Sequence, residues 1–158
     1  MRLAGIAPVA KVIPSYQNLM RRLFHPPETR HWGTDMNQNL DRVQPEIEKT
    51  QRAFCLEHNA EFLPTLPESK LGYALSTKGR LPVNGLRHLP EGDTSGWYIW
   101  CGEDFSDAED FFAPLHTKHV YDDQPELTKL LGLAPGYRFL IAGDHLDVWY
   151  DAALLPKT

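Results

Sequence analysis

The chain has 158 residues, of which 42% are hydrophobic and 23% are charged, a composition typical of a globular protein. This length fits one domain, or one domain with an appended segment. The net charge of −5 argues against nucleic acid or an anionic membrane as a partner, because both are polyanions, and no stretch approaches the roughly 20 apolar residues of a membrane span.

The first part of the chain is predicted to be helical and to lead into a linker. Ser15 suits a helix N-cap, and the segment YQNLMRRLF that follows it has apolar residues at helical spacing, namely Tyr16, Leu19, Met20 and Leu23. The pair Pro26-Pro27 ends this helix. Residues 26–43 are polar and show no periodicity, which indicates a linker.

A second helix is predicted in the segment PEIEKTQRAFCLEHNAEF, residues 45–62. Pro45 suits its first turn, and Asn59 is a suitable end. The apolar residues expected to form its buried stripe are Ile47, Ala53, Phe54 and Leu56.

From Leu71 onward the sequence becomes rich in strand-forming residues. The segments LGYALST, residues 71–77, and SGWYIWCGE, residues 95–103, each predict a strand through their aromatic and apolar content. Between them, LPVNGLRHL contains Asn84-Gly85, a pair that strongly favours a tight turn.

The remaining segments predict two short helices followed by a hairpin. The helices are expected in APLHTKHVYDD, residues 113–123, and in QPELTKLLGL, which begins near Pro125 and closes at Gly132. The segment YRFLIAGDHLDVWYD predicts a hairpin with Gly143-Asp144 near its turn.

This order of elements predicts an α+β fold, with a mostly antiparallel sheet, short helices and a helical N-terminal extension. We expect residues 1–70 to form the extension and linker, and residues 71–158 to form the α+β domain. The elements do not alternate regularly between strand and helix, which argues against a doubly wound nucleotide-binding fold.

The segment GWYIWCGEDFSDAEDFF, residues 96–112, joins the most hydrophobic run of the chain to its most acidic one. The first half predicts a core strand in which Trp97 and Ile99 face one side, and Tyr98 and Trp100 the other. The chain is then expected to leave the sheet at Gly102 and to expose the acidic residues that follow.

The acidity of the chain is mostly local, since residues 103–126 carry eight acids and one base. A dense set of carboxylates can simply keep a loop solvated, or it can attract a basic partner. Aromatic residues at its base would add contact area. The residues predicted to bind a partner are Trp100, Glu103, Asp104, Phe105, Asp107, Glu109, Asp110, Asp122 and Asp123.

Candidate catalytic and metal-binding patterns are weak. His116 and His119 stand at i, i+3 on a predicted helix, but a zinc helix would read H-E-x-x-H and a third ligand is undefined. The run after Cys101 does not match a calcium loop, and acidic neighbours make that cysteine a poor nucleophile. We therefore predict no catalytic residue, no metal and no cofactor. A metal-dependent or hydrolytic enzyme using the two histidines stays open as the alternative, as does a stress or housekeeping adaptor.

The two cysteines and the N-terminus indicate a compartment. Cys55 and Cys101 have no zinc spacing and no disulfide framework, so they are predicted to be buried free thiols. Free thiols suit a reducing cytoplasm. The N-terminal apolar run is broken by Pro8 and Lys11, which argues against a signal peptide.

Several motifs together resemble a bacterial domain family, number thirty-three in the series of immunity proteins associated with polymorphic toxin systems. The motifs are SGWYIWCGED, FFAPLH and LGLAPGYRFLI followed by DVWYD, and the resemblance covers about residues 71–155. The matching positions are Ser95, Gly96, Trp97, Gly102, Glu103, Pro135, Gly136, Arg138, Phe139, Asp147 and Trp149.

The resemblance implies an immunity protein that binds a cognate toxin and neutralises it by occlusion. Residues 1–70 lie outside it, and Arg87 is followed by His88 where the family often has an acid. The shared positions are typical of fold residues, so they leave the identity of the toxin open. Because nucleases carry basic surfaces that bind phosphates, a nuclease is the first candidate for the toxin of an acidic immunity protein.

Overall fold

The computed structural model describes residues 45–157 of the chain. The helix predicted after Ser15 and the linker predicted at residues 26–43 lie outside the described residues. The division into residues 1–70 and 71–158 stays a prediction.

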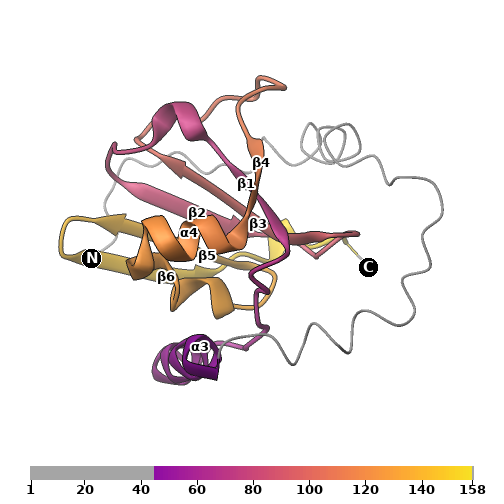
Figure 1. Cartoon of the computed structure of the whole chain (residues 1–158), viewed down its shortest axis with the longest axis vertical. Coiled ribbons are helices and arrows are strands. Elements are labelled where there is room, and N and C mark those ends of the chain that lie inside the picture. The colour runs from indigo at the N-terminus through magenta and orange to yellow at the C-terminus, as the bar shows by residue number, and fades with distance from the viewer. Residues whose placement is uncertain (1–44, 158) are drawn as a thin grey trace.

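A single sheet of six strands organises the described residues (Figure 1). Its order is β4-β1-β3-β2-β5-β6, and only β1 and β3 are paired in parallel. The strands are β1 Lys70–Tyr73, β2 Val83–Arg87, β3 Thr94–Cys101, β4 Ala113–His116, β5 Tyr137–Ala142 and β6 His145–Tyr150. Together with the short helices, this mostly antiparallel sheet confirms the predicted α+β class.

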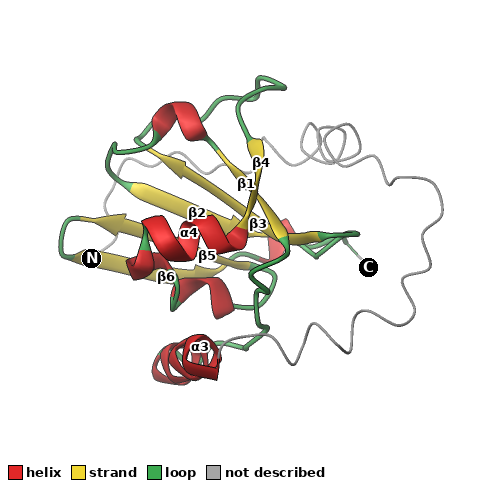
Figure 2. Ribbon diagram, viewed as in Figure 1, coloured by secondary structure: helices red, strands yellow, loops and turns green. Residues whose placement is uncertain are grey.

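The helices are few and mostly short (Figure 2). They comprise α3 Pro45–Glu57 and α4 Thr117–Asp123, with 3-10 turns η2 Leu75–Thr77, η3 Pro125–Leu127, η4 Leu130–Gly132 and η5 Ala152–Leu154. Side chains from α3, α4, η3 and η4 join those of the sheet in one large apolar cluster. These elements therefore cover the same face of the sheet.

The central strand β3 is buried along its whole length on both faces. Trp97 and Ile99 belong to the large cluster, whereas Tyr98 and Trp100 belong to a second cluster with Leu86 of β2. The predicted alternation along this strand is confirmed. Because both faces of β3 are covered, apolar residues occupy nearly every position of the strand instead of alternating with polar residues.

The hairpin predicted near the C-terminus is also confirmed. Strands β5 and β6 pair in continuous register from Tyr137↔Tyr150 to Ala142↔His145. Gly143 adopts a φ of 60° in the two-residue turn, a conformation that glycine reaches at low cost.

The turn predicted at Asn84-Gly85 is wrong, because both residues lie inside β2. Gly85 pairs with Phe139 of β5, and a Cβ at position 85 would overlap the Phe139 ring. The Asn84 side chain donates to the carbonyl oxygen of Gly102 at 3.0 Å. Close packing against Phe139 therefore requires the glycine at position 85, and the hydrogen bond to Gly102 accommodates Asn84 inside the strand.

The buried side of α3 differs from the predicted stripe. Phe54 and Cys55 are buried, but Ala53 is exposed and Leu56 is 80% exposed. The helix instead buries Gln51, whose amide donates to the Tyr121 hydroxyl and to the Thr128 carbonyl oxygen, both at 3.0 Å. The helix ends just before Asn59, which has a φ of 49°, as predicted for its C-terminal residue.

Three other predicted elements are shorter than expected or of another type. The segment at residues 71–77 is a strand only to Tyr73 and then a 3-10 turn, and the segment at residues 113–123 begins as strand β4 before α4. The helix predicted around Pro125 consists of two 3-10 turns. In each segment, pairing or packing with distant residues decides the conformation of a short apolar run.

A buried arginine connects several parts of the fold. The Arg87 guanidinium donates to the carbonyl oxygens of Leu133 at 2.6 Å, Leu63 at 2.8 Å and Ser95 at 3.0 Å. Burial lowers the pKa of Arg87 to about 9, so the group still carries its charge at neutral pH. This side chain therefore joins β2 and β3 to the segments before β1 and after η4.

The partly buried His88 should make stability depend on pH below neutrality. Its Nδ1 lies 2.9 Å from the Leu154 carbonyl oxygen, and burial lowers its pKa to about 4 from 6.5. The unfolded chain therefore takes up this proton near pH 6.5 and the folded chain only near pH 4, so stability falls as the pH falls through that window. We expect this group to cost about 2 kcal/mol at pH 5 relative to pH 7.5.

Urea unfolding of the wild type and of His88→Gln at both pH values measures this contribution. The variant should lose about 2 kcal/mol less than the wild type between the two pH values, whatever its stability at pH 7.5. Equal losses for the two proteins would show that His88 does not carry the effect.

Candidate functional site

The acidic loop, residues 103–110, lies in the connection between β3 and β4 (Figure 1). Gly102 begins this connection with a φ of 93°. Its N–H donates to the Pro82 carbonyl oxygen at 2.8 Å. The chain thus leaves the sheet at Gly102, as the sequence predicts, and the start of the loop is fixed to Pro82, the residue before β2.

The carboxylates of the acidic loop are directed to solvent. The five acids in it are exposed, namely Glu103, Asp104, Asp107, Glu109 and Asp110. A group of like charges this dense creates a negative potential that attracts cationic surfaces and repels anionic ones. The arrangement can therefore recruit a basic macromolecule.

The aromatic residues of this region support the loop from below. The ring centroid of Phe105 lies 5.2 Å from that of Trp100 and 5.4 Å from that of Phe111. Phe111 in turn lies 4.8 Å from Phe112, which belongs to the second core cluster. Such edge-to-face packing holds the loop against the sheet, so the carboxylates are displayed on an anchored loop.

Trp100 does not have the exposure that the sequence analysis expected. Its side chain is 4% exposed and lies within the second core cluster. Its ring is covered because Phe105 and Phe112 pack against it at 5.2 and 6.4 Å. Trp100 thus supports the loop from inside, whereas Phe105, like Phe111, is only partly covered.

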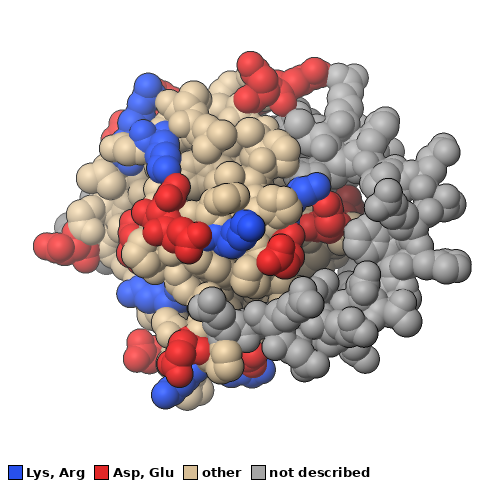
Figure 3. Space-filling view, in the orientation of Figure 1, with Lys and Arg blue, Asp and Glu red and all other residues tan. Residues whose placement is uncertain are grey.

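Asp122 and Asp123 are exposed at the C-terminal end of α4. Asp123 pairs with Lys78 of the β1–β2 connection at 3.0 Å. Figure 3 shows acidic side chains over the β3–β4 connection at the top of the molecule, apart from those over α4. The structure therefore divides the predicted acidic surface into two patches.

Two exposed leucines that were not predicted from the sequence lie in a connection bonded to the end of β3, from which the acidic loop departs. Leu75 is 49% exposed and Leu81 is 63% exposed, and both lie in the connection between β1 and β2. This connection is bonded to the end of β3, where the Thr77 hydroxyl accepts from the Cys101 N–H at 2.8 Å. Their exposure could have been predicted from their position in the polar segment ALSTKGRLP, because apolar residues in such a stretch lack the periodicity of a buried face.

The histidine pair predicted to share a helix is divided between two elements. His116 is the last residue of β4, whereas His119 lies in α4, and their ring centroids are 6.4 Å apart. His116 Nδ1 lies 3.2 Å from the Glu68 carbonyl oxygen. Within residues 45–157, no group of three or more His, Cys, Asp and Glu side chains could hold a metal ion.

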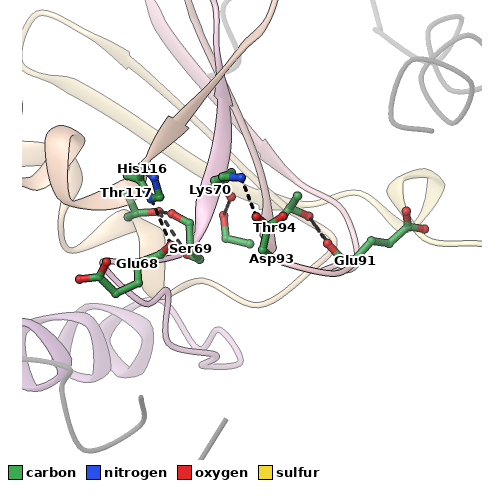
Figure 4. A network of polar contacts seen from close by, with 9 residues as sticks. Glu68, Ser69, Lys70, Glu91, Asp93, Thr94, His116 and Thr117 are labelled. Carbon is green, nitrogen blue, oxygen red and sulfur yellow. Dashed lines mark hydrogen bonds and ion pairs between the residues drawn. The ribbon is translucent and has the colours of Figure 1, made fainter. Parts of the chain in front are cut away.

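The surroundings of His116 form a structural network at the start of β1 (Figure 4). The Thr117 hydroxyl donates to the Ser69 carbonyl oxygen at 3.0 Å, and Lys70 pairs with Asp93 at 2.7 Å. These contacts join the ends of β1, β3 and β4. The polar residues around His116 are therefore explained by their role in holding these strand ends together.

Both cysteines are buried free thiols, as predicted. Cys101 Sγ lies 3.6 Å from the Tyr73 hydroxyl inside the large cluster, and burial raises the pKa of the Cys55 thiol. None of the described helices has the length and apolar character required to cross a membrane.

Comparison with known proteins connects this geometry to one family. A family model described as Imm33-like domain matches residues 50–151 of the chain. The matched range begins within α3 and ends directly after β6, so it contains the whole sheet and the acidic loop. No curated protein and no solved structure matches the chain.

Proposed function

Because the chain belongs to the Imm33-like domain family, we propose that it is an immunity protein that binds a cognate bacterial toxin in the cytoplasm. It neutralises the toxin by stoichiometric occlusion and performs no catalysis. The observation that supports this mechanism is the anchored acidic loop, residues 103–110. A loop already held in place loses little conformational entropy on binding, so more of its interaction energy contributes to affinity.

The charge of the loop suits a basic toxin surface. Nucleases carry such surfaces because they bind phosphates, and a nuclease is therefore our first candidate for the partner. Exposed carboxylates act mainly on the association rate, and salt screens them over about 10 Å at 0.1 M. The association rate with the toxin should accordingly fall as the salt concentration rises.

The apolar part of the proposed interface comes from residues beside the acids. Phe105 is partly exposed within the loop, and Leu75 and Leu81 lie in the neighbouring connection. We propose that these side chains form the centre of the contact and slow dissociation, because apolar anchors surrounded by polar groups dominate binding energy. In this proposal, Asp122 and Asp123 strengthen the attraction from a distance, and Trp100 acts by supporting Phe105.

Reversing three charges of the loop tests the proposal. The variant Asp104→Lys, Asp107→Lys, Asp110→Lys should lose about 2–5 kcal/mol of binding energy to the cognate toxin, because it sets like charges against each other. Its free energy of unfolding should stay within about 0.5 kcal/mol of the wild type, since the three side chains are exposed. Protection of toxin-expressing cells and the binding rates are the measurements.

A matched control carries the same change in net charge elsewhere. Glu57, Glu61 and Glu91 are exposed and lie outside the loop, and their replacement by lysine should leave protection intact. Full protection by a folded loop variant would remove the loop from the interface. An equal loss of protection in both triple variants would show that the overall charge of the protein, and not the loop, causes the effect.

A further inference from the structure

The two edges of the sheet are protected to different degrees. β4 has four residues and includes Pro114, which lacks a backbone donor. β6 has six residues without proline or lysine, and its ladder with β5 shows no bulge. Short strands, proline, lysine and bulges are the usual means by which an edge avoids pairing with another strand. β6 has none of these four, its one carboxylate is Asp147, and no described strand pairs with its outer side.

The hairpin turn decides which backbone groups of β6 point outward. Ala142 and His145 flank a two-residue turn and form a pair across it, which in such hairpins is the hydrogen-bonded kind. Hydrogen-bonded and non-hydrogen-bonded pairs alternate along an antiparallel ladder. The N–H and C=O groups of Leu146, Val148 and Tyr150 are therefore directed away from β5.

The same three residues place apolar side chains along the edge. Leu146 and Val148 pack partly against the large cluster, and Tyr150 is 53% exposed. After β6 the chain turns back onto the sheet, where Leu154 joins the second cluster beside Leu86. The described part of the C-terminal segment therefore leaves the outer side of β6 open.

We propose that β6 pairs antiparallel with β6 of a second copy of this chain, about a two-fold axis at Val148. In this register Val148 faces the partner's Val148 and Leu146 faces the partner's Tyr150, so apolar residues oppose apolar residues. The alternative register centred on Asp147 would oppose two carboxylates, which is destabilising. The register centred on Val148 thus opposes its apolar residues and sets each Asp147 against the partner's Trp149 instead of a second carboxylate, and a second copy is the occupant that this pattern fits.

The proposed dimer is compatible with toxin binding but does not depend on it. The sheet order places β6 at one margin and β4, which follows the acidic loop, at the other. Pairing through β6 would therefore extend the sheet while leaving the acidic loop of each copy free. Because one strand pair buries less area than a standard interface, we expect a dissociation constant on the order of micromolar.

Sedimentation of the purified full chain over about 1–200 µM tests the proposal. The wild type should shift from monomer to dimer across this range. Val148→Lys should weaken association at least about tenfold, because it opposes two ammonium groups across the axis. Pro114→Lys, an exposed position on the β4 edge, should leave association unchanged. A monomer at every concentration would overturn the proposal, and it is also the result expected if β6 pairs with a strand of the toxin instead. A dimer retained by Val148→Lys would overturn it as well.

Disulfide cross-linking tests the register without relying on the lysine variant. Facing Cα atoms in a hydrogen-bonded pair are about 5.5 Å apart, within disulfide reach, so Val148→Cys should cross-link two chains under mild oxidation. Two copies of Leu146→Cys would place their cysteines about 14 Å apart along the strand, which is too far. The native cysteines are buried and should stay free. Equal cross-linking at both positions would show that the proposed register is wrong.

Discussion

Replacing Arg87 with methionine should lower the free energy of unfolding by about 3–5 kcal/mol. The guanidinium donates to carbonyl oxygens at Leu63, Ser95 and Leu133, and its side chain is 1% exposed. Methionine fills much of the volume but leaves those buried acceptors without their donor, and each such loss costs about 1–3 kcal/mol. Urea unfolding of the wild type and the variant measures the difference.

Two further variants separate this effect from a general need for a cation. Arg87→Lys should recover only part of the loss, because an ammonium cannot reproduce the planar fork that reaches three segments. Arg80→Met removes an exposed arginine and should change stability by no more than about 0.5 kcal/mol. A loss below about 1 kcal/mol for Arg87→Met would contradict the connecting role assigned to this side chain.

Replacing Gly96 with alanine should destabilise the fold by about 3 kcal/mol or more. Gly96 has a φ of 82°, which costs a residue with a Cβ about 1–2 kcal/mol. A Cβ at this position would also overlap the carbonyl oxygen of His88, and backbone cannot move aside as a flexible side chain can. That contact lies where the Gly96 carbonyl oxygen accepts from the His88 N–H at 2.9 Å, so the ladder between β2 and β3 must distort.

Gly79 provides the matched control for the dihedral angle alone. It has a φ of 90°, and a Cβ there would meet no atom within 4 Å. Gly79→Ala should therefore cost only about 1–2 kcal/mol. Thermal or urea unfolding of both variants gives the comparison, and equal costs would mean that the backbone contact at position 96 is relieved without distortion.

The residues that carry the family resemblance are explained by this packing. Ser95 provides the carbonyl that accepts from Arg87, Gly96 permits the close approach to His88, and the Trp97 indole donates to the Leu131 carbonyl oxygen at 3.1 Å. These are requirements of the fold. They act on the proposed interface only by holding β3, from whose end the acidic loop departs.

The contacts of Arg87 could not be predicted from the sequence. The sequence shows an arginine in a strand, and nothing local indicates that its donors reach carbonyl oxygens at residues 63 and 133. The same limit explains the misassigned turn at Asn84-Gly85. That pair favours a turn by itself, but opposite Phe139 the missing Cβ serves close packing between β2 and β5.

Three features of the candidate site were determined by the sequence itself. The alternation of β3 side chains between the two core clusters follows from the two-residue period of a strand within an apolar run. The exit at Gly102 follows from a glycine placed between that run and five carboxylates. The exposure of those carboxylates follows equally, because a charge is costly to bury. These are local properties, and local properties can be read from neighbouring residues.

The composition of the surface around the loop was decided only by the tertiary structure. Trp100 is covered because Phe105 and Phe112 fold over it, and Asp123 faces Lys78, which lies far away in the sequence. The connection that carries Leu75 and Leu81 meets the end of β3, where the acidic loop begins, because β1 and β2 flank β3 in the sheet. Strand order brings together segments that share no local signal, and for that reason the sequence predicted the charge of this surface but not its apolar part.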